Sequence, residues 1–332
     1  MRIGVYGNLT LDELYQNGKL VVRPGGSALY SSLAAAYLGA RVSIYSMIGS
    51  DYPRNVLSLI KNRGIDVSGV NKLHGLTTRF KISYLADSRR LELINPGQKL
   101  KPGSTRDSLH AIHLGPVFLE IGLNTLHYAR YHSKFLSLDV QGLLRTEGPK
   151  GFVRLARKRI DQFLSKCNLV KATEDEARVI APAATIVSTA RRLLHKGPQY
   201  VIITRGRSGS LLVEKEGGAL HIPSVPEARV VDLTGAGDIF LGGWLATFLS
   251  VRDALWAGAA GAAFASLSVR GFGASKFRFA RKNCSGELRG LTRTQDLSRA
   301  NKSERSKPRS NCPLRSIRTC LFSPLSLARL VR

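Results

Sequence analysis

The chain has 332 residues, of which 43% are hydrophobic and 22% are charged, and its formal net charge is +27. The first two values are ordinary for a globular protein and exclude fibrous and wholly disordered classes. There is no apolar run of the length that spans a bilayer, and the first residues lack the apolar segment of a secretory signal. We therefore expect a cytoplasmic protein of enzyme size.

Positive charge is densest at the C-terminal end. Residues 276–332 hold 15 Lys and Arg against 3 Asp and Glu, and no helix or strand period runs through them. One interpretation is a basic arm that binds nucleic acid through its phosphates. The alternatives are a solvated, disordered tail and a terminus outside the fold, such as one read in a shifted frame. We therefore predict a folded domain over 1–275 and a basic tail over 276–332.

Short β-branched runs alternate with helical segments up to about residue 275. Strands are predicted over 3–6, 42–47, 111–114, 135–140, 169–171, 200–204 and 210–214. Helices are predicted over 27–38, 54–63, 119–130, 153–166, 174–180, 185–195, 235–249 and 254–269. This alternation predicts an α/β fold with a mainly parallel sheet and helices on both faces. Ligands of such sheets bind at the carboxyl ends of the strands.

Two segments, at about 9–24 and 77–94, instead alternate polar and apolar positions. In the second, Phe80, Ile82 and Tyr84 fall on one face and a turn follows near residue 87. We interpret the two segments as a small antiparallel sheet that forms a lid over the substrate. An extension of the main sheet is the alternative.

Small residues precede the apolar helix predicted at 235–249. The amides of Gly235, Ala236 and Gly237 lie at a helix N-terminus, where a phosphate can approach unpaired donors at the positive end of the dipole. Asp238 follows in the first turn, where a carboxylate could accept the proton of an attacking hydroxyl. The alternative is a tight turn with Asp238 as a capping acid.

The string D-x-T-G-A-G-D-x-F over 232–240 resembles the C-terminal signature of the PfkB/ribokinase family of sugar and nucleoside kinases. Segments resembling other landmarks of this family occur in the same order: GNLTLD at 7–12, PGGS at 24–27, IGSD at 48–51, TEDE at 173–176 and TRGRSG at 204–209. The resemblance covers about residues 3 to 275 and stops at the basic tail. It implies a ribokinase-like fold and a kinase that uses ATP with Mg²⁺.

The resemblance also implies roles for individual residues. By role they are Asp238 as catalytic base; Gly235, Ala236 and Gly237 as anion hole; Asn8, Asp12, Gly25 and Gly26 as acceptor site; Thr204, Gly206 and Gly209 as nucleotide site; and Glu176, which orients magnesium through water. The chain departs from the family pattern where Ser27 and Tyr30 replace the frequent Lys and Asn of sugar kinases, and where Thr173 replaces Asn.

Three further segments, at 25–32, 77–91 and 138–145, resemble archaeal myo-inositol kinases. They imply a polyol or sugar acceptor, with Asp139 and Gln141 as hydrogen-bonding partners for its hydroxyls. Capping or loop support is the alternative role for Asp139. A nucleoside acceptor on the same fold is the second functional hypothesis, and nucleic-acid binding through the tail of an inactive scaffold is the third.

The resemblance also implies a homodimer, because lid strands in this family often pair between subunits. His110 and His113 are three residues apart with no carboxylate at ligand spacing, so the sequence predicts no metal site there.

Overall fold

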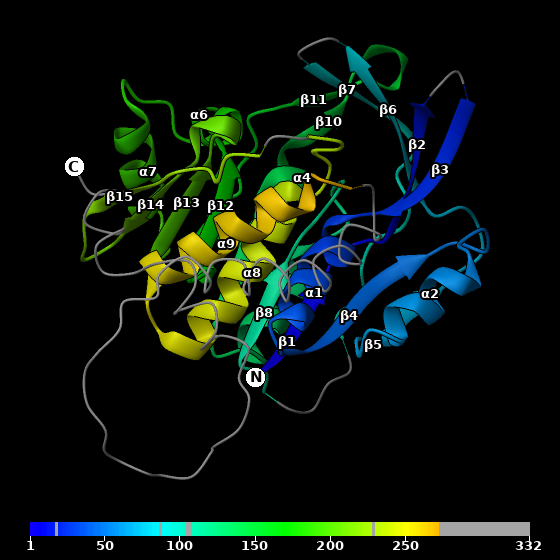
Figure 1. Ribbon diagram of the computed structural model, residues 1–332, viewed down its shortest axis with the longest axis horizontal. Coiled ribbons are helices and arrows are strands. Elements are labelled where there is room, and N and C mark those ends of the chain that lie inside the picture. The colour runs from blue at the N-terminus through cyan, green and yellow to red at the C-terminus, as the bar shows by residue number, and fades with distance from the viewer. Residues whose placement is uncertain (17–18, 86–87, 104–107, 228–229, 272–332) are drawn as a thin grey trace, which may run out of the picture.

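The computed structural model of the protein describes residues 1–16, 19–85, 88–103, 108–227 and 230–271. The predictions made for the basic tail at 276–332, and for the turn near residue 87, lie outside the described residues. Figure 1 shows the described chain as a layered α/β body with a separate small sheet that projects from one edge.

The body is built on a sheet of nine described strands in the order β15-β14-β13-β12-β9-β8-β1-β4-β5. Their bounds are β1 Arg2–Tyr6, β4 Arg41–Ile48, β5 Asp66–Lys72, β8 Ala111–Leu114, β9 Leu136–Asp139, β12 Leu169–Thr173, β13 Tyr200–Thr204, β14 Ser210–Glu214 and β15 Ala219–Ile222. Neighbours from β5 to β13 pair in parallel, whereas β14 pairs antiparallel with β13 and with β15. The predicted mainly parallel sheet is confirmed.

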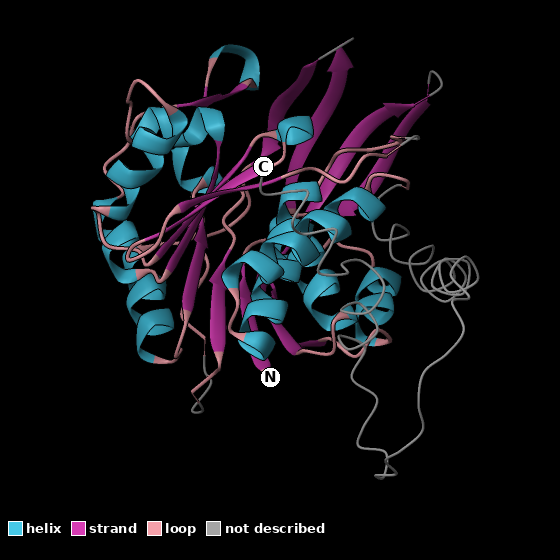
Figure 2. Ribbon diagram, turned by 60° about the vertical axis from the view of Figure 1, so that its left-hand side comes forward, coloured by secondary structure: helices cyan, strands magenta, loops and turns pink. Residues whose placement is uncertain are grey.

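Helices cover both faces of this sheet (Figure 2). One layer holds α1 (Ser27–Tyr37), α2 (Arg54–Lys61), α8 (Ala236–Val251) and α9 (Ala254–Ser268), and the other holds α3 (Leu123–Tyr131), α5 (Asp161–Lys166), α6 (Glu174–Ile180) and α7 (Ile186–Leu194). Helix α8 is apolar almost all round because it lies under both α1 and α9. None of the described helices combines the length and the apolar character needed to cross a membrane.

The second sheet contains both segments in which polar and apolar residues alternate. Its order is β3 (Lys19–Gly25), β2 (Thr10–Gln16), β6 (Thr78–Leu85) and β7 (Ser88–Asn95). The two hairpins are antiparallel as predicted, but they join through a parallel pairing of β2 with β6. We call this four-stranded sheet the lid sheet; it lies at the upper right of Figure 1.

A charged network ties the lid sheet to the body. Arg79 on β6 donates to Asp51, in the loop after β4, at 2.9 Å and to Glu13 on β2 at 3.1 Å. The second oxygen of Asp51 accepts from the amide and the hydroxyl of Thr77. Because Asp51 belongs to the body, these bonds fix the root of the lid sheet relative to the main sheet.

Several predicted elements were wrong. The helix predicted at 153–166 is instead strand β11 (Val153–Leu155), paired with β10 (Arg145–Glu147), followed by the short α5. This pairing is a tertiary contact that local propensity does not encode. The helix predicted at 119–130 begins only at Leu123, because Leu119 adopts a φ of 59° that cannot continue a helix. Strands β5 and β15 were not predicted.

Candidate functional site

The strand ends and the lid sheet enclose a cavity of about 990 Å³. One end lies against the lid sheet and is lined by Thr10, Asp12, Phe80, Ile82, Leu91, Val117, Gln141 and Arg145. The other end lies beside the loops after β12 and β13 and is lined by Thr173, Glu174, Asp175, Thr204, Arg205, Gly206, Arg207, Gly209, Ser224, Val225, Pro226, Glu227, Val230, Ala262, Ala265, Ser266 and Val269. The first turn of α8 lies between the two ends. The cavity is therefore at the strand edge that the sequence predicted.

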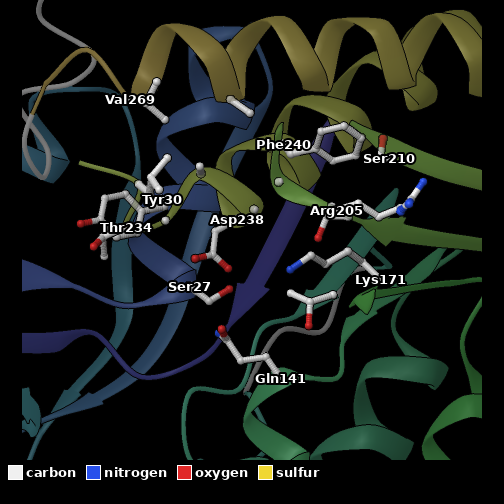
Figure 3. A pocket seen from close by; sticks show the side chains of 18 of the residues that line it. Ser27, Tyr30, Gln141, Lys171, Arg205, Ser210, Thr234, Asp238, Phe240 and Val269 are labelled. Atoms are coloured by element: carbon white, nitrogen blue, oxygen red, sulfur yellow. The ribbon is translucent and has the colours of Figure 1, made fainter. Parts of the chain in front are cut away.

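Asp238 points into this cavity from the first turn of α8, and Ser27, Gln141 and Lys171 lie around it (Figure 3). Burial, together with the negative charge of Asp139, raises the pKa of Asp238 to about 6, while Lys171 and the Ser27 hydroxyl act in the opposite direction. Asp238 is thus a carboxylate near neutral pH that is easily protonated below it. That property suits a group that accepts a proton during a reaction.

A buried ion pair lies beside Asp238. Lys171 on β12 is 4% exposed and its Nζ donates to Asp139, at the end of β9, at 2.8 Å. Burial alone lowers the pKa of the Lys171 ammonium, but the charges of Asp139, Glu176 and Asp238 overcome this effect and hold the pKa above its ordinary value. Lys171 therefore brings a permanent positive charge to the floor of the cavity.

The turn before α8 brings this positive charge next to the helix N-terminus. A Cβ on Gly237 would lie 3.0 Å from Nζ of Lys171, so the ammonium is close to the backbone of the turn. Gly235 is the N-cap, with a φ of 76°, and a Cβ there would lie 2.4 Å from the ring of Tyr30, which explains the glycine. The Ala236 amide donates to the carbonyl of Leu233 at 3.2 Å, so this predicted anion-hole donor already has a protein acceptor.

The lid end of the cavity combines polar and apolar surfaces. Asp12 is 6% exposed and accepts from the Thr10 hydroxyl at 2.9 Å. Arg145 donates to Gln141 at 2.9 Å and lies over the ring of Phe80 at 5.6 Å from its centroid. Around Phe80, the apolar side chains of the lid sheet and of Val117 form a continuous wall. This end can therefore hold hydroxyl groups on one side and a flat apolar group on the other.

The opposite end has a polar loop and an apolar mouth. Gly206 and Gly209 both have positive φ, which lets the loop after β13 turn tightly at the cavity. Arg205 in this loop is paired with Glu174 at 2.9 Å. At the mouth, Val225 and Val230 are 43% and 40% exposed. Apolar side chains exposed in this way at a cavity mouth can pack against a planar ring.

Glu176 lies next to the cavity but does not line it. Its carboxylate accepts from the Thr173 amide at 2.8 Å, and the Thr173 hydroxyl accepts from the Glu176 amide, which makes a capping box at the start of α6. Burial and the charge of Asp139 raise the pKa of Glu176. Within the part of the chain that is described, no cluster of three His, Cys, Asp or Glu side chains could hold a metal ion directly.

The structure brings together most of the residues predicted from the sequence. Those that line the cavity are Asp12, Gly26, Gln141, Thr204, Gly206, Gly209, Gly235, Ala236, Gly237 and Asp238. Asn8 and Asp139 are instead fully buried behind its wall. The side-chain amide of Asn8 donates to the hydroxyl of Thr78 and to the carbonyl of Gln98. Asp139 accepts from the Lys171 ammonium and from the backbone amide of Gln141. For Asp139 the geometry matches the alternative role of loop support.

Gly25, which was also predicted at the acceptor site, lies outside the cavity lining but against Asp12. A Cβ on Gly25 would lie 2.2 Å from Oδ2 of Asp12, so the glycine lets this carboxylate reach its position. The cavity also contains Ser27, Arg145 and Lys171, to which the sequence analysis gave no role. Of these three residues, only Lys171 has a sequence feature that could have indicated it, because it is a charged residue inside the apolar strand LVKAT.

Comparison with known proteins gives consistent matches. The model of the family described as pfkB family carbohydrate kinase matches residues 2–278. A cytidine kinase from Thermococcus kodakarensis is 31% identical over 252 residues, which cover 74% of this chain and 87% of the relative. An inositol 3-kinase from Zea mays is 28% identical over 289 residues, covering 82% of this chain and 73% of the relative.

Solved structures share the fold at lower sequence identity. A pyrophosphate-dependent kinase in the ribokinase family, complexed with a pyrophosphate analogue and myo-inositol, matches with a TM-score of 0.70 and 20% identity over 82% of this chain and 96% of that chain. A ribokinase from Thermotoga maritima matches with a TM-score of 0.67 and 20% identity over 85% and 99%. The fold is thus ribokinase-like, and the chain belongs to the pfkB family of carbohydrate kinases.

Proposed function

We propose that the protein transfers the γ-phosphate of ATP to a hydroxyl group of a small polyol, sugar or nucleoside, with Asp238 as general base. The observation that carries this proposal is the position of Asp238, between the two ends of one cavity and beside a helix N-terminus and Lys171. The acceptor oxygen forms a bond to the γ-phosphorus, the bond to the bridging oxygen breaks and ADP leaves. The hydroxyl proton passes to Asp238.

Positive groups near Asp238 stabilise the transferring phosphate in this proposal. The amides of Gly235 and Gly237 provide donors at the positive end of the α8 dipole. Lys171 adds a full charge next to Gly237. Because the phosphate carries negative charge throughout the transfer, fixed positive groups lower the barrier without reorganising.

The apolar mouth supports a nucleotide as donor. Val225, Val230, Ala262 and Val269 line this end of the cavity, and an adenine ring would cover the exposed valines. Thr204, Gly206 and Gly209 line the same end of the cavity, along which the ribose and phosphates would extend. A pyrophosphate donor, like that named for one structural neighbour, would leave the mouth uncovered.

The residues present fit a magnesium ion that is held mainly by the nucleotide phosphates. Mg²⁺ keeps several waters and needs only one or two carboxylates in such sites. Glu176 uses one carboxylate oxygen in its capping box, so it would act through water, and Asp175 is an exposed carboxylate on the same cavity. When bound, the ion would neutralise phosphate charge.

The lid end favours a nucleoside as acceptor. A pyrimidine ring fits the wall formed by Phe80, Ile82 and Leu91, while Asp12 can accept from sugar hydroxyls. The cytidine kinase relative supports the same class. The second candidate, myo-inositol, is supported by the polar group of Asp12, Gln141 and Arg145 and by the inositol 3-kinase relative. Bound myo-inositol would leave the apolar wall in contact with water.

A panel of acceptors tests this choice. With ATP and Mg²⁺, we expect cytidine to give a higher kcat/KM than adenosine, ribose, fructose 6-phosphate or myo-inositol, and pyrophosphate to be a poor donor. Phe80→Leu should raise the KM for cytidine more than the KM for myo-inositol, because only the base needs the aromatic wall. Leu59→Ala, at an exposed position of α2 outside the cavity, is the control. Highest kcat/KM with myo-inositol would reverse the order of the two candidates, and no transfer to any acceptor would contradict the proposed function.

We also propose that the lid sheet pairs two copies of the chain. Leu20 and Val22 on its edge strand β3 are 49% and 46% exposed, a large exposure for apolar side chains. Sedimentation of the purified protein should give twice the monomer mass. The double variant Leu20→Glu, Val22→Glu should be a monomer. It should still show the thermal unfolding transition of the body. A monomeric wild type would contradict the pairing.

A further inference from the structure

Two buried polar atoms beside the cavity make no hydrogen bond of ordinary geometry among the described residues, although the hydroxyl of one of them, Ser27, faces Asp238 closely enough to lower its pKa. They are Nε2 of His113, on β8, and Oγ of Ser27, the first residue of α1. Both residues are 1% exposed. A buried polar group that stays unpaired costs about 1–3 kcal/mol, so two of them side by side call for an explanation.

The two atoms converge on the same point next to Gly115. A Cβ on Gly115 would lie 2.4 Å from Ser27 Oγ and 2.9 Å from His113 Nε2. Glycine at this position therefore leaves the space between the two side chains open to both. A small rotation of the Ser27 hydroxyl, or one water molecule with these two partners, would satisfy both atoms.

The other ring nitrogen of His113 is already engaged. Nδ1 lies 3.0 Å from the hydroxyl of Ser137, which is fully buried on the neighbouring strand β9. Burial lowers the pKa of His113 to about 4, so the ring is neutral near neutral pH. A neutral imidazole has one donor and one acceptor nitrogen. If the Ser137 hydroxyl donates to Nδ1, Nε2 carries the hydrogen and faces Ser27.

We propose that His113 is a positioning residue, whose Nε2–H donates to Oγ of Ser27, directly or through one water molecule, and so directs the Ser27 hydroxyl proton toward the Asp238 carboxylate. The inference rests on the proposed role of Asp238. Ser27 is next to this carboxylate in Figure 3, and its hydroxyl lowers the pKa of Asp238. A donor held in this direction keeps the carboxylate ionised and oriented toward the acceptor hydroxyl.

Charged groups around Asp238 come from three other elements: Asp139 on β9, Arg145 on β10 and Lys171 on β12. Because the His113 ring is neutral, replacing it removes no charge, and the charges of Asp139, Arg145 and Lys171 remain in place. A change in the pH dependence of His113 variants would therefore report the direction of the Ser27 hydroxyl and not the loss of a charge.

The first test is the tautomer of His113 in the resting protein. In ¹⁵N spectra of histidine-labelled protein, the signal that disappears in His113→Gln should show a neutral ring with hydrogen on Nε2 across the neutral pH range. A hydrogen on Nδ1 would overturn the proposal, because Nε2 would then have nothing to donate. This measurement needs no turnover, so it is independent of the proposed function.

The second test is kinetic. His113→Leu should lower kcat about tenfold, leave KM within about twofold and move the acidic limb of the kcat profile to higher pH. His113→Gln restores a donor near Nε2 and should recover most of kcat and the wild-type limb. Ser137→Ala, a smaller change in the core, should give an intermediate loss.

Controls separate positioning from packing. Ser32→Ala removes another buried and unpaired hydroxyl from the same helix and should change neither kcat nor the pH profile. If His113→Gln and His113→Leu lose kcat equally with an unshifted limb, the role of His113 is structural and the proposal fails. If the wild type transfers no phosphate, the proposed function fails, while the tautomer result still stands.

Discussion

Replacing Asp238 with Asn should lower kcat by about a thousandfold, with little change in KM or in the free energy of unfolding. The amide has almost the same shape as the carboxylate but cannot accept the proton of the attacking hydroxyl. Steady-state kinetics with the best acceptor, together with a denaturant titration, measure both quantities. Retention of more than about a tenth of wild-type kcat would contradict the role of Asp238 as general base.

The pH profile of the wild type belongs to the same prediction. Because the pKa of Asp238 is raised to about 6, kcat should fall as the pH drops below that value and the carboxylate becomes protonated. The matched control is Glu216→Gln, which neutralises an exposed carboxylate that does not line the cavity. It should leave both kcat and the acidic limb close to wild type.

Lys171→Met should lower the free energy of unfolding by about 3 kcal/mol, because it leaves the buried Asp139 carboxylate without its partner. The same change should move the acidic limb of kcat to higher pH, since Lys171 lowers the pKa of Asp238. Urea denaturation measures the first effect, and the kcat profile the second. A variant as stable as the wild type would show that the pair contributes nothing to the fold.

Two comparisons identify the cause of the lost stability. Lys196→Met breaks the partly exposed pair with Asp161 and should cost less than about 1 kcal/mol, because water screens such pairs. Adding Asp139→Asn to Lys171→Met removes the unpaired buried charge and should recover part of the stability. No recovery in the double variant would indicate that lost packing of the lysine stem, and not charge, is the cause.

Local sequence patterns predicted the body of the fold because most of its signals lie within single elements. The strands at Ala111–Leu114, Tyr200–Thr204 and Ser210–Glu214 and the helix at Glu174–Ile180 match the predicted ranges residue for residue. Each of these strands is a short apolar run, and the helix begins at a Thr173 capping box. In contrast, β10 and β11 have no such pattern, because each exists only through its pairing with the other.

The candidate site likewise contains one part that the sequence predicts and another that only the structure shows. Asp238 and the glycines beside it are contiguous in sequence, so the helix opening, its dipole and its acid could be predicted together. The sequence by itself determined this local unit and the edge of the sheet where it lies. Only the tertiary structure decided that Lys171 pairs with Asp139, and that His113 and Ser27 converge beside Gly115. These residues come from different strands and helices, and burial selects their partners because unpaired charges and donors are costly only away from water.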